Sequence, residues 1–156
     1  MHILRVTLDH LDSLVPLFDD YRIFYAQNSD VDGAREFLKK RMKQGEAVIF
    51  LAFPEAPSPG VTEQALGFML LYPHFSSVSI KHTWILNDLF VAPEARRQGV
   101  ANQLLAIAEA FAVENQAKGL QLETDKVNAK AKALYESRGW VMDQELDHYS
   151  FLAETH

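Results

Sequence analysis

The sequence predicts a single α/β domain, built on a mixed, twisted central sheet of about six or seven strands with helices on both faces. Its 156 residues are enough for one well-buried core and too few for two. Apolar strand-like runs and helix-like segments follow one another as strand, helix, helix, three strands, helix, strand, helix and two strands. A buried strand at residues 84–91 leads through a turn into the main helix. We therefore expect one domain over residues 1–156.

The N-terminal segment reads as a short strand and a helix. Ile3–Val6 is the strand candidate, and the helix follows it. The residues near one stripe of period 3.6 are Leu11, Leu14, Val15, Phe18, Arg22 and Tyr25. Either Ser13 caps this helix and Pro16 lies in its first turn, or Pro16 kinks a longer helix that begins at Asp9.

The second helix has clearer end signals. Ser29 and Asp32 have the spacing of a capping box, and Gly45 is a natural C-terminal stop. The stripe between them consists of Val31, Ala34, Leu38 and Met42.

The middle of the chain predicts three strands and the main helix. Val48–Phe53 is apolar throughout, residues 54–64 form a proline-rich hairpin loop, and a strand over Ala65–Tyr72 ends at Pro73. The central strand, Trp84–Val91, stops before Pro93. The main helix starts at Gly99 and ends near Gly119.

The C-terminal part predicts a strand, a helix and a closing pair of strands. Leu120–Asp125 alternates as a strand with one buried face. Asn128–Arg138 is a short helix that Gly139 closes. Trp140–Gln144 and His148–Leu152 are expected to pair antiparallel.

Composition excludes several classes of function. The absence of cysteine rules out disulfides, thiolate metal sites and a cysteine nucleophile, and the six histidines lack ligand spacing, so we expect no metal. A net charge of −6 argues against nucleic-acid binding. Because the chain shows neither a leader pattern nor an apolar run of ~20 residues, we expect a cytoplasmic protein without a membrane partner.

The turn between the central strand and the main helix predicts an anion site. The first amides of a helix have no intrahelical partner and lie at the positive end of its dipole. Gly99 and Ala101 would let a phosphate approach them, and Arg96 and Arg97 add positive charge. The stretch lacks both the Walker sequence and the three glycines of the dinucleotide fingerprint. It therefore indicates another diphosphate-bearing cofactor.

The same stretch carries a family resemblance. Arg96–Ala101 (RRQGVA) fits the pattern Gln/Arg-x-x-Gly-x-Gly/Ala, and the segments DLFVAPEARRQGVANQLL and NAKAKALYESRGW occur in the expected order. In these motifs the chain resembles the GCN5-related N-acetyltransferases (GNAT family), especially the diamine and polyamine type. The resemblance implies acetyl-CoA as cofactor, CoA as product, and a homodimer formed through the C-terminal strands.

The resemblance also implies which residues bind the cofactor. The backbone of Leu89, Phe90 and Val91 would hold the pantetheine arm like an extra strand. The diphosphate would lie on the turn and first helical residues, Arg96, Arg97, Gln98, Gly99, Val100, Ala101 and Asn102. Asn128 would contact the CoA arm, cap the last helix, or do both.

Acetylation of an amine requires two proton transfers. An alkyl ammonium with a pKa near 10.4 is about 1 part in 2,500 free base at pH 7, a cost of roughly 4–5 kcal/mol. The departing thiolate needs only a mild acid, and Tyr135 occupies the position of the family's protonating tyrosine.

The proton acceptor is left open. Relatives of the diamine type carry a glutamate where this chain has Asn87. Asp88 points to the opposite face of an ideal strand unless a bulge re-aims it. Glu123 on the neighbouring strand, or a water chain through Asn87, are the other candidates.

The acceptor is expected to bind near the first two helices. The substrate-binding candidates are Tyr21, Arg22, Tyr25, Tyr72 and Glu123. Arg22 would suit an acceptor that carries a carboxylate, such as an amino acid, or it pairs with Asp19 or Asp20 on the surface.

Together these features predict direct transfer of an acetyl group to the primary amine of a small molecule, which would be a diamine, an amino acid or an analogue. Two alternatives remain: a non-catalytic acyl-CoA-binding sensor, and an acetyltransferase for protein lysines or N-termini.

Overall fold

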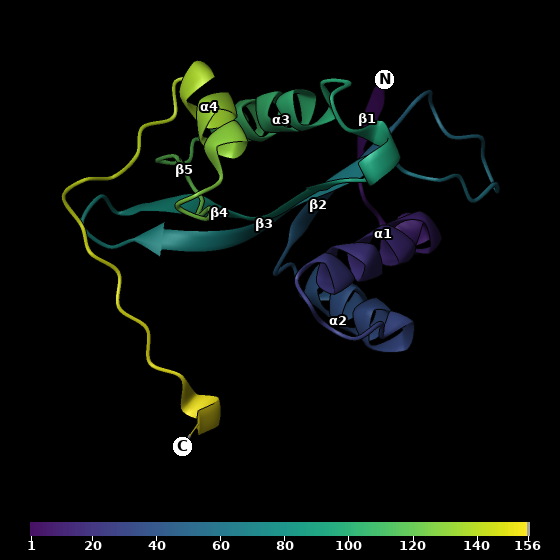
Figure 1. Cartoon of the computed structure of the whole chain (residues 1–156), viewed down its shortest axis with the longest axis horizontal. Helices are drawn as coiled ribbons and strands as arrows, with labels where there is room; N and C mark the ends of the chain where they lie inside the picture. The colour runs from purple at the N-terminus through teal and green to yellow at the C-terminus, as the bar shows by residue number, and fades with distance from the viewer. Residues whose placement is uncertain (156) are drawn as a thin grey trace. The chain divides into compact units, whose positions relative to one another are not determined.

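The structure is a computed structural model that describes residues 1–155, and the chain divides into two compact units, Met1–Glu123 and Thr124–His156. The first unit contains a five-stranded sheet in the order β1-β2-β3-β4-β5 (Figure 1). Its strands are β1 (His2–Arg5), β2 (Val48–Phe53), β3 (Gly67–Ser76), β4 (Lys81–Val91) and β5 (Leu120–Gln121). The first four pair antiparallel and β5 runs parallel to β4, so the sheet is mixed as predicted.

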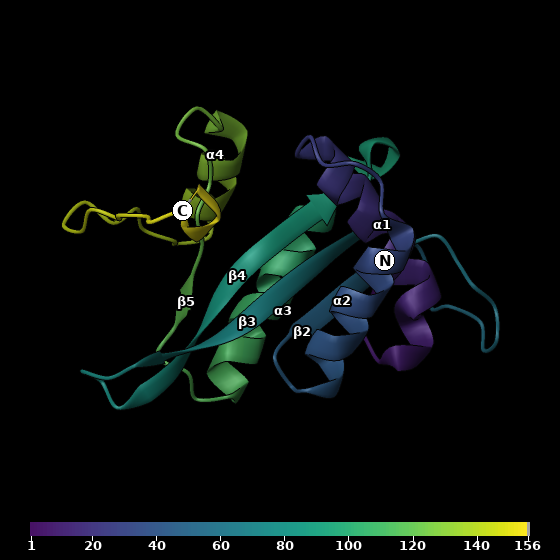
Figure 2. The ribbon, with the colours of Figure 1, turned by 90° about the horizontal axis from the view of Figure 1, so that it is seen from below.

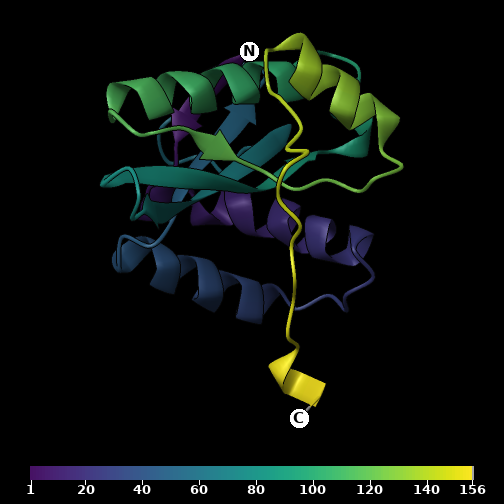
Figure 3. The same ribbon diagram turned by 90° about the vertical axis from the view of Figure 1, so that its left-hand side faces the viewer.

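Helices cover both faces of this sheet. α1 (Leu11–Phe24) and α2 (Val31–Lys43) lie on one face, and α3 (Val100–Glu114) lies on the other (Figure 3). All six residues of β2 are buried, which is why this strand reads as one continuous apolar run. The core on both sides of the sheet includes Leu14, Leu38, Phe68, Leu71 and Leu104, each 0% exposed.

The second unit contains α4 (Ala129–Ser137) and an extended tail. Asn128 caps α4, because its side-chain oxygen accepts a hydrogen bond from the Ala131 amide at 3.1 Å. The tail continues to a 3₁₀ turn at Ala153–Thr155.

The number of strands corrects the sequence prediction. The described residues form five strands and not six or seven, β5 is two residues long, and residues 140–144 and 148–152 form no strand pair. Side chains that the pairing would have buried are exposed, among them Val141 at 91% and Tyr149 at 94%. Two short strands that bury no apolar face gain too little to pair on their own.

The start of α1 differs from both predicted alternatives. A 3₁₀ turn over Leu8–His10, capped by Thr7, precedes the helix, which begins at Leu11. Pro16 lies inside α1 on the exposed side. Because proline has no N–H, it leaves the Asp12 carbonyl without its usual intrahelical donor.

The cap of α2 and the end of β3 also differ. Asp30, not Ser29, caps α2 by accepting from the Gly33 amide at 2.9 Å. β3 continues through Pro73 to Ser76 instead of stopping (Figure 2). The pairing with β2 ends at Leu71, so Pro73 lies where β3 is an edge strand and its missing N–H breaks no ladder.

Candidate functional site

A β-bulge in β4 creates the site. Leu70 of β3 pairs with Asp88 and the next residue, Leu71, pairs with Leu86, so Asn87 is an extra residue on β4. A bulge shifts the alternation of side chains by one. Asp88 is consequently buried, with 8% of its surface exposed, whereas Asn87 is exposed. The bulge on which the Asp88 hypothesis depended is present.

Two neutral donors hold the Asp88 carboxylate. The Tyr21 hydroxyl, from α1, donates to Oδ1 at 2.7 Å. The Asn87 side-chain amide donates to both carboxylate oxygens at 3.1 Å. No cation pairs with Asp88 among residues 1–155, because the ion pairs there involve other carboxylates. The carboxylate is therefore oriented but not neutralised.

Aromatic rings surround this carboxylate. The Tyr21 ring lies edge-on to Phe68, Phe90 and Tyr25, with centroid separations of 5.4, 5.6 and 5.1 Å. Phe24 extends the cluster, 5.2 Å from Tyr25, and it is 61% exposed. The aromatic cluster therefore extends from the buried carboxylate of Asp88 to the exposed ring of Phe24.

Burial sets the electrostatics of the site. It raises the pKa of Asp88, although the hydrogen bonds from Tyr21 and Asn87 act in the opposite direction. The pKa of Tyr21 is also raised, first by burial and then by its hydrogen bond to Asp88, so its hydroxyl stays protonated as a donor. Burial, followed by the charge of Asp88, raises the pKa of Tyr72, while Arg41 opposes the rise. The pKa of Tyr72 therefore responds to the charge of the Asp88 carboxylate.

Arg22 takes part in the loop between α1 and α2. Its Nη1 donates to the Asn28 carbonyl at 2.9 Å and lies 3.8 Å from Asp19 Oδ1. Asp19, only 4% exposed, also accepts from the Ser29 hydroxyl at 2.6 Å and from the Asp30 amide at 2.8 Å. These bonds lower the pKa of Asp19. The ion-pair alternative for Arg22 is the arrangement that the structure contains.

The turn before α3 has the backbone of an anion site. Arg97 and Gly99 adopt left-handed conformations with φ of 63° and 80°, and no side chain caps α3. A Cβ on Gly99 would meet nothing within 4 Å, so the space beside the first helical amides is open. Successive amides in such a turn form a concavity that suits a diphosphate. Val100 is buried, and Ala101 and Asn102 follow it in the first helical turn.

The side chains of the turn take different directions. Gln98 donates to the Glu94 carbonyl at 3.2 Å. Arg96 donates through Nε to the Val91 carbonyl at 3.1 Å, and its guanidinium carbon lies 5.7 Å from the ring centres of both Phe24 and Phe90. Arg96 therefore stacks on the aromatic cluster, which the sequence motif could not reveal.

The edge of β4 beside the turn is open. β5 pairs with β4 only at Trp84 and Ile85, so Leu89, Phe90 and Val91 lie beyond it. Their other edge is occupied by β3. An extended chain added at the open edge would find free backbone groups, which fits the pantetheine arm that the sequence predicts.

The remaining predicted residues belong to the end of the first unit and to the second unit. Glu123 is exposed and follows β5. Asn128 and Tyr135 belong to the second unit, where the Tyr135 ring centre lies 6.0 Å from that of Trp140. Their catalytic and cofactor roles stay predictions. Phe68 belongs to the cluster but is not among the residues predicted from the sequence, since a buried strand phenylalanine gives no local signal.

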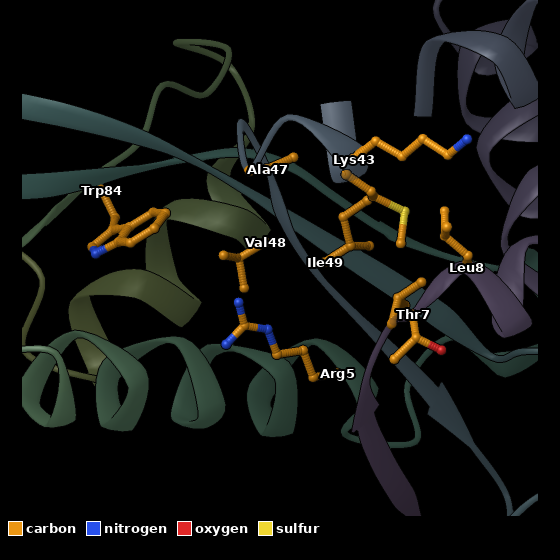
Figure 4. Close-up of a pocket in the computed structure, with 11 residues that line it drawn as sticks. Arg5, Thr7, Leu8, Lys43, Ala47, Val48, Ile49 and Trp84 are labelled. Atoms are coloured by element: carbon orange, nitrogen blue, oxygen red, sulfur yellow. The ribbon is translucent and has the colours of Figure 1, made fainter. Parts of the chain in front are cut away.

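A cavity of about 340 Å³ lies at the other end of the first unit, between β1, β2 and the end of α2 (Figure 4). Arg5, Thr7, Lys43 and Trp84 are among the residues that line it, and none of the predicted site residues does. Its lining contains no acid, so it offers no proton acceptor.

Two further observations concern the described residues as a whole. Within residues 1–155, no three His, Asp or Glu side chains gather as metal ligands. In the same range, the helices are too short or too polar to cross a membrane.

Comparison with known proteins shows the family to which the chain belongs. The chain is 43% identical over 149 residues to the uncharacterized N-acetyltransferase YhfO of Bacillus subtilis, covering 96% of this chain and 95% of that one. A thialysine N-epsilon-acetyltransferase of Caenorhabditis elegans is 26% identical, with 89% and 82% covered. A crystal structure of a probable acetyltransferase superposes with a TM-score of 0.89 at 45% identity and 97% coverage of both chains. The acetyltransferase (GNAT) family model matches residues 14–140, and the chain belongs to that family.

Proposed function

We propose that this protein moves the acetyl group of acetyl-CoA directly to the primary amine of a small molecule, with Asp88 as the proton acceptor. Membership of the family makes the chain an N-acetyltransferase and implies acetyl-CoA as the acetyl donor. The observation that carries the proposal is the hydrogen bond of 2.7 Å from Tyr21 to Asp88 at the bulge. It presents a buried, unpaired carboxylate beside an aromatic surface.

In this proposal, Asp88 accepts the proton that the ammonium group must lose before its nitrogen can attack the thioester. An incoming ammonium ion would gain a charge partner in the carboxylate and quadrupole contacts with the rings of Tyr21 and Tyr25. Because burial raises the pKa of Asp88, the carboxylate is a stronger base than an exposed aspartate. Tyr21 and Asn87 keep its oxygens oriented, and Tyr72 adds a further protonated hydroxyl nearby.

The residues of the first unit fit the cofactor. We assign the diphosphate to the backbone of Arg97–Asn102 and the pantetheine arm to the open edge of Leu89–Val91. When bound, acetyl-CoA supplies the acetyl thioester that an amine can attack. In the same proposal Asn128 contacts the CoA arm, and the Tyr135 hydroxyl holds the proton for the departing thiolate.

The acceptor class is a diamine, an amino acid or an analogue. The Caenorhabditis elegans relative is named for thialysine, which carries both an amine and a carboxylate. The exposed rings of Phe24 and Tyr25 offer a surface for a short aliphatic chain next to Asp88. We assign acceptor contacts to Tyr21, Tyr25 and Tyr72.

We further propose that the protein is a homodimer. Apolar side chains of the tail are exposed in a single copy, including Tyr149 at 94% and Leu146 at 66%. A second copy would cover them, and light scattering on a gel-filtered sample should give twice the monomer mass. A monomer at micromolar concentration would contradict this part of the proposal.

The direct test is an assay of CoA release with a thiol reagent. Acetyl-CoA is supplied with single amines from a panel of diamines, basic amino acids and lysine peptides. We expect release that depends on a free small amine and follows saturation kinetics. A protein that acetyl-CoA stabilises against heat but that releases no CoA with any amine would be a sensor. If only the lysine peptides are acetylated, the acceptor is a protein lysine and not a small molecule.

A further inference from the structure

We propose that the cavity between β1, β2 and the end of α2 binds a small organic acid, whose carboxylate is held by Arg5 and whose apolar body lies on the cavity floor. The cavity belongs to the first unit, and none of its lining residues is among the proposed contacts of acetyl-CoA or of the acceptor amine. It is therefore a second ligand site, and its test does not depend on acetyl transfer.

The cavity has the composition of a pocket for a small amphipathic molecule. Its volume of about 340 Å³ lies at the lower end of the range for ligand pockets, about 300–1,000 Å³. Val6, Val48 and Ile49 provide an apolar floor, with exposed fractions of 7, 7 and 2%. The charged residues of the lining, Arg5 and Lys43, are exposed. A ligand would bury its apolar body and keep its polar group near these cations.

The positive charge of the lining is not balanced by an acid. No Asp or Glu lines the cavity beside Arg5 and Lys43. Within residues 1–155, neither of these two side chains forms an ion pair, because the arginines that do so are Arg22, Arg35 and Arg41. A hollow with charges of one sign and apolar walls raises the local concentration of the opposite ion. The cavity therefore favours an anionic ligand.

Arg5 is oriented without the use of its hydrogen-bond donors. Its guanidinium carbon lies 5.7 Å from the ring centre of Phe111 on α3. Stacking on an aromatic ring restricts the guanidinium plane and leaves its N–H groups available. Figure 4 shows the guanidinium turned toward Val48, on the side where Trp84 lies. A planar guanidinium placed in this way can bind a carboxylate with two parallel hydrogen bonds.

Lys43 differs from Arg5 in its direction and in its rigidity. In Figure 4 its side chain extends away from Arg5, so the two cations do not converge on one point. A lysine is also a flexible and strongly hydrated point charge that lacks the planar fork. We therefore assign the carboxylate to Arg5 alone, and Lys43 adds only positive potential to the cavity.

The ligand class follows from this arrangement. A carboxylate on Arg5 would have Val48 and the ring of Trp84 on the same side, so an aromatic or aliphatic body joined to it by a short chain could cover both. An α-amino acid does not suit the cavity, because its ammonium group would lie near Arg5 and Lys43 and would find no acid. The ligand is thus a monocarboxylic acid with an apolar body.

The test uses 3-phenylpropionate as the probe. Its amide, 3-phenylpropanamide, lacks the charge, and acetate lacks the apolar body. Trp84 and Trp140 are the two tryptophans of the chain, so Trp140→Phe leaves the cavity residue Trp84 as the only indole. In this variant we expect a saturable change of tryptophan fluorescence with 3-phenylpropionate and a Kd below about 1 mM. The amide and acetate should bind at least about tenfold more weakly. Calorimetry on the wild type should give the same Kd.

Variants of the lining separate a carboxylate site from general attraction by positive charge. Arg5→Gln should weaken the binding of 3-phenylpropionate by about tenfold or more, and Arg5→Lys should fall between it and wild type. Lys43→Gln is the matched control, because it removes the same charge from the same lining, and it should stay within about threefold of wild type. Ala47→Phe keeps both cations but fills the cavity with a ring, so it should abolish binding. Thermal melts check that each variant is folded.

Each contrary result would overturn a defined part of the inference. Equal losses in Arg5→Gln and Lys43→Gln would remove Arg5 as the anchor, and equal affinities for the acid and its amide would remove the anion site. Saturating acetyl-CoA should leave the Kd for 3-phenylpropionate unchanged, so displacement of the probe would place it in the cofactor site instead. An absence of saturable binding up to about 10 mM in calorimetry would overturn the site as a whole. Because these measurements follow binding and not acetyl transfer, their failure would leave the proposed function intact.

Discussion

Trp84 and Phe90 lie an even number of residues apart on β4 but face opposite sides of the sheet. The Trp84 ring packs 5.0 Å from Phe111 of α3, and the Phe90 ring packs 5.6 Å from Tyr21 of α1. Regular alternation would place both on one face. The extra residue at Asn87 reverses the alternation between them. Asp88 therefore shares the α1 face with Phe90, and the aromatic cluster forms around it.

Replacing Asp88 with asparagine should lower the catalytic rate without lowering the stability of the fold. The substitution keeps the shape and an oxygen that can accept from Tyr21, but it removes the base. We expect kcat to fall by about 10²–10⁴-fold. Steady-state CoA release with the preferred amine measures it.

The same variant should not be less stable at neutral pH. Burial raises the folded-state pKa of Asp88, so the stability that the protonated form provides is lost as the pH rises through that value. Asparagine carries no charge to bury. Thermal melts at pH 7.5 should give a Tm equal to or above that of wild type. A Tm lowered by many degrees would show that Asp88 has a structural role that the site does not explain.

Tyr21→Phe should move the pH dependence of the reaction. The Tyr21 hydrogen bond lowers the pKa of Asp88, so its removal raises that pKa further. The base must be deprotonated, and the acidic limb of the kcat/KM profile should therefore shift to higher pH. At neutral pH we expect a loss of about tenfold, the usual effect of one hydrogen bond to a charged group. Tyr149→Phe, in the exposed tail, is the matched control and should leave the profile in place.

The parts of the fold that sequence could predict are those set by local signals. Val48–Phe53 was expected residue for residue because a strand covered on both faces must be apolar at every position. The start of α3 and the cap of α4 followed from Gly99 and Asn128. The prediction of a closing strand pair was wrong. The sequence shows that these segments contain apolar residues, but it does not show which other residues would cover them, and in the structure they are exposed.

The arrangement of the candidate site could not be predicted from local sequence signals, because it depends on contacts between residues that are far apart in the chain. The sequence named Asp88 and the bulge it needs, but Leu86, Asp88 and Phe90 alternate as if they shared a face. The register between β3 and β4, together with the helices packed on the two faces of β4, reveals the reversal. The motif placed Arg96 in the turn, yet the direction of its side chain depends on Phe24, which lies 72 residues earlier in the chain. The sequence offered an ion pair of Arg22 with Asp19 or Asp20, and the structure contains the pair with Asp19 and a hydrogen bond to the Asn28 carbonyl, whereas a role of Arg22 in acceptor binding stays a prediction.

Gly99→Ala should weaken the response to acetyl-CoA. In wild type, ligand at 100 times its Kd should add about 2.7 kcal/mol, or roughly 5–10 °C in Tm. An alanine at φ 80° costs about 1–2 kcal/mol, and the turn can relax only by moving the amides that bind phosphate. We expect a shift reduced by more than half, with ATP and NAD giving none in either protein. Gly60→Ala introduces the same strain at φ 77° in the loop before β3, and it should keep the full shift.

Tyr135→Phe tests the predicted acid. Loss of the hydroxyl should lower kcat by about 10²-fold or more, because nothing then protonates the leaving thiolate. The thermal shift with acetyl-CoA should stay close to that of wild type. Unchanged turnover would remove Tyr135 from the mechanism, whereas a lost thermal shift would place it in cofactor binding instead.

Asp19→Asn should destabilise the protein in a pH-dependent way. Asp19 accepts from Ser29 and from the Asp30 amide, and these bonds lower its folded-state pKa below the ordinary value of 3.8. A lowered carboxyl pKa contributes stability that is present above the unfolded-state value and is lost as the pH falls through the folded-state value. Asparagine offers one acceptor where two donors converge, so we expect a loss of roughly 1.5–3 kcal/mol in the free energy of unfolding at pH 7.

Urea unfolding at pH 7, 5 and 3 should show that the difference in free energy of unfolding between the Asp19→Asn variant and wild type becomes smaller as the pH falls. Asp20→Asn, at the exposed neighbouring position, should stay within about 0.5 kcal/mol of wild type throughout. A gap for Asp19→Asn that persists unchanged at pH 3 would assign its effect to packing and not to charge.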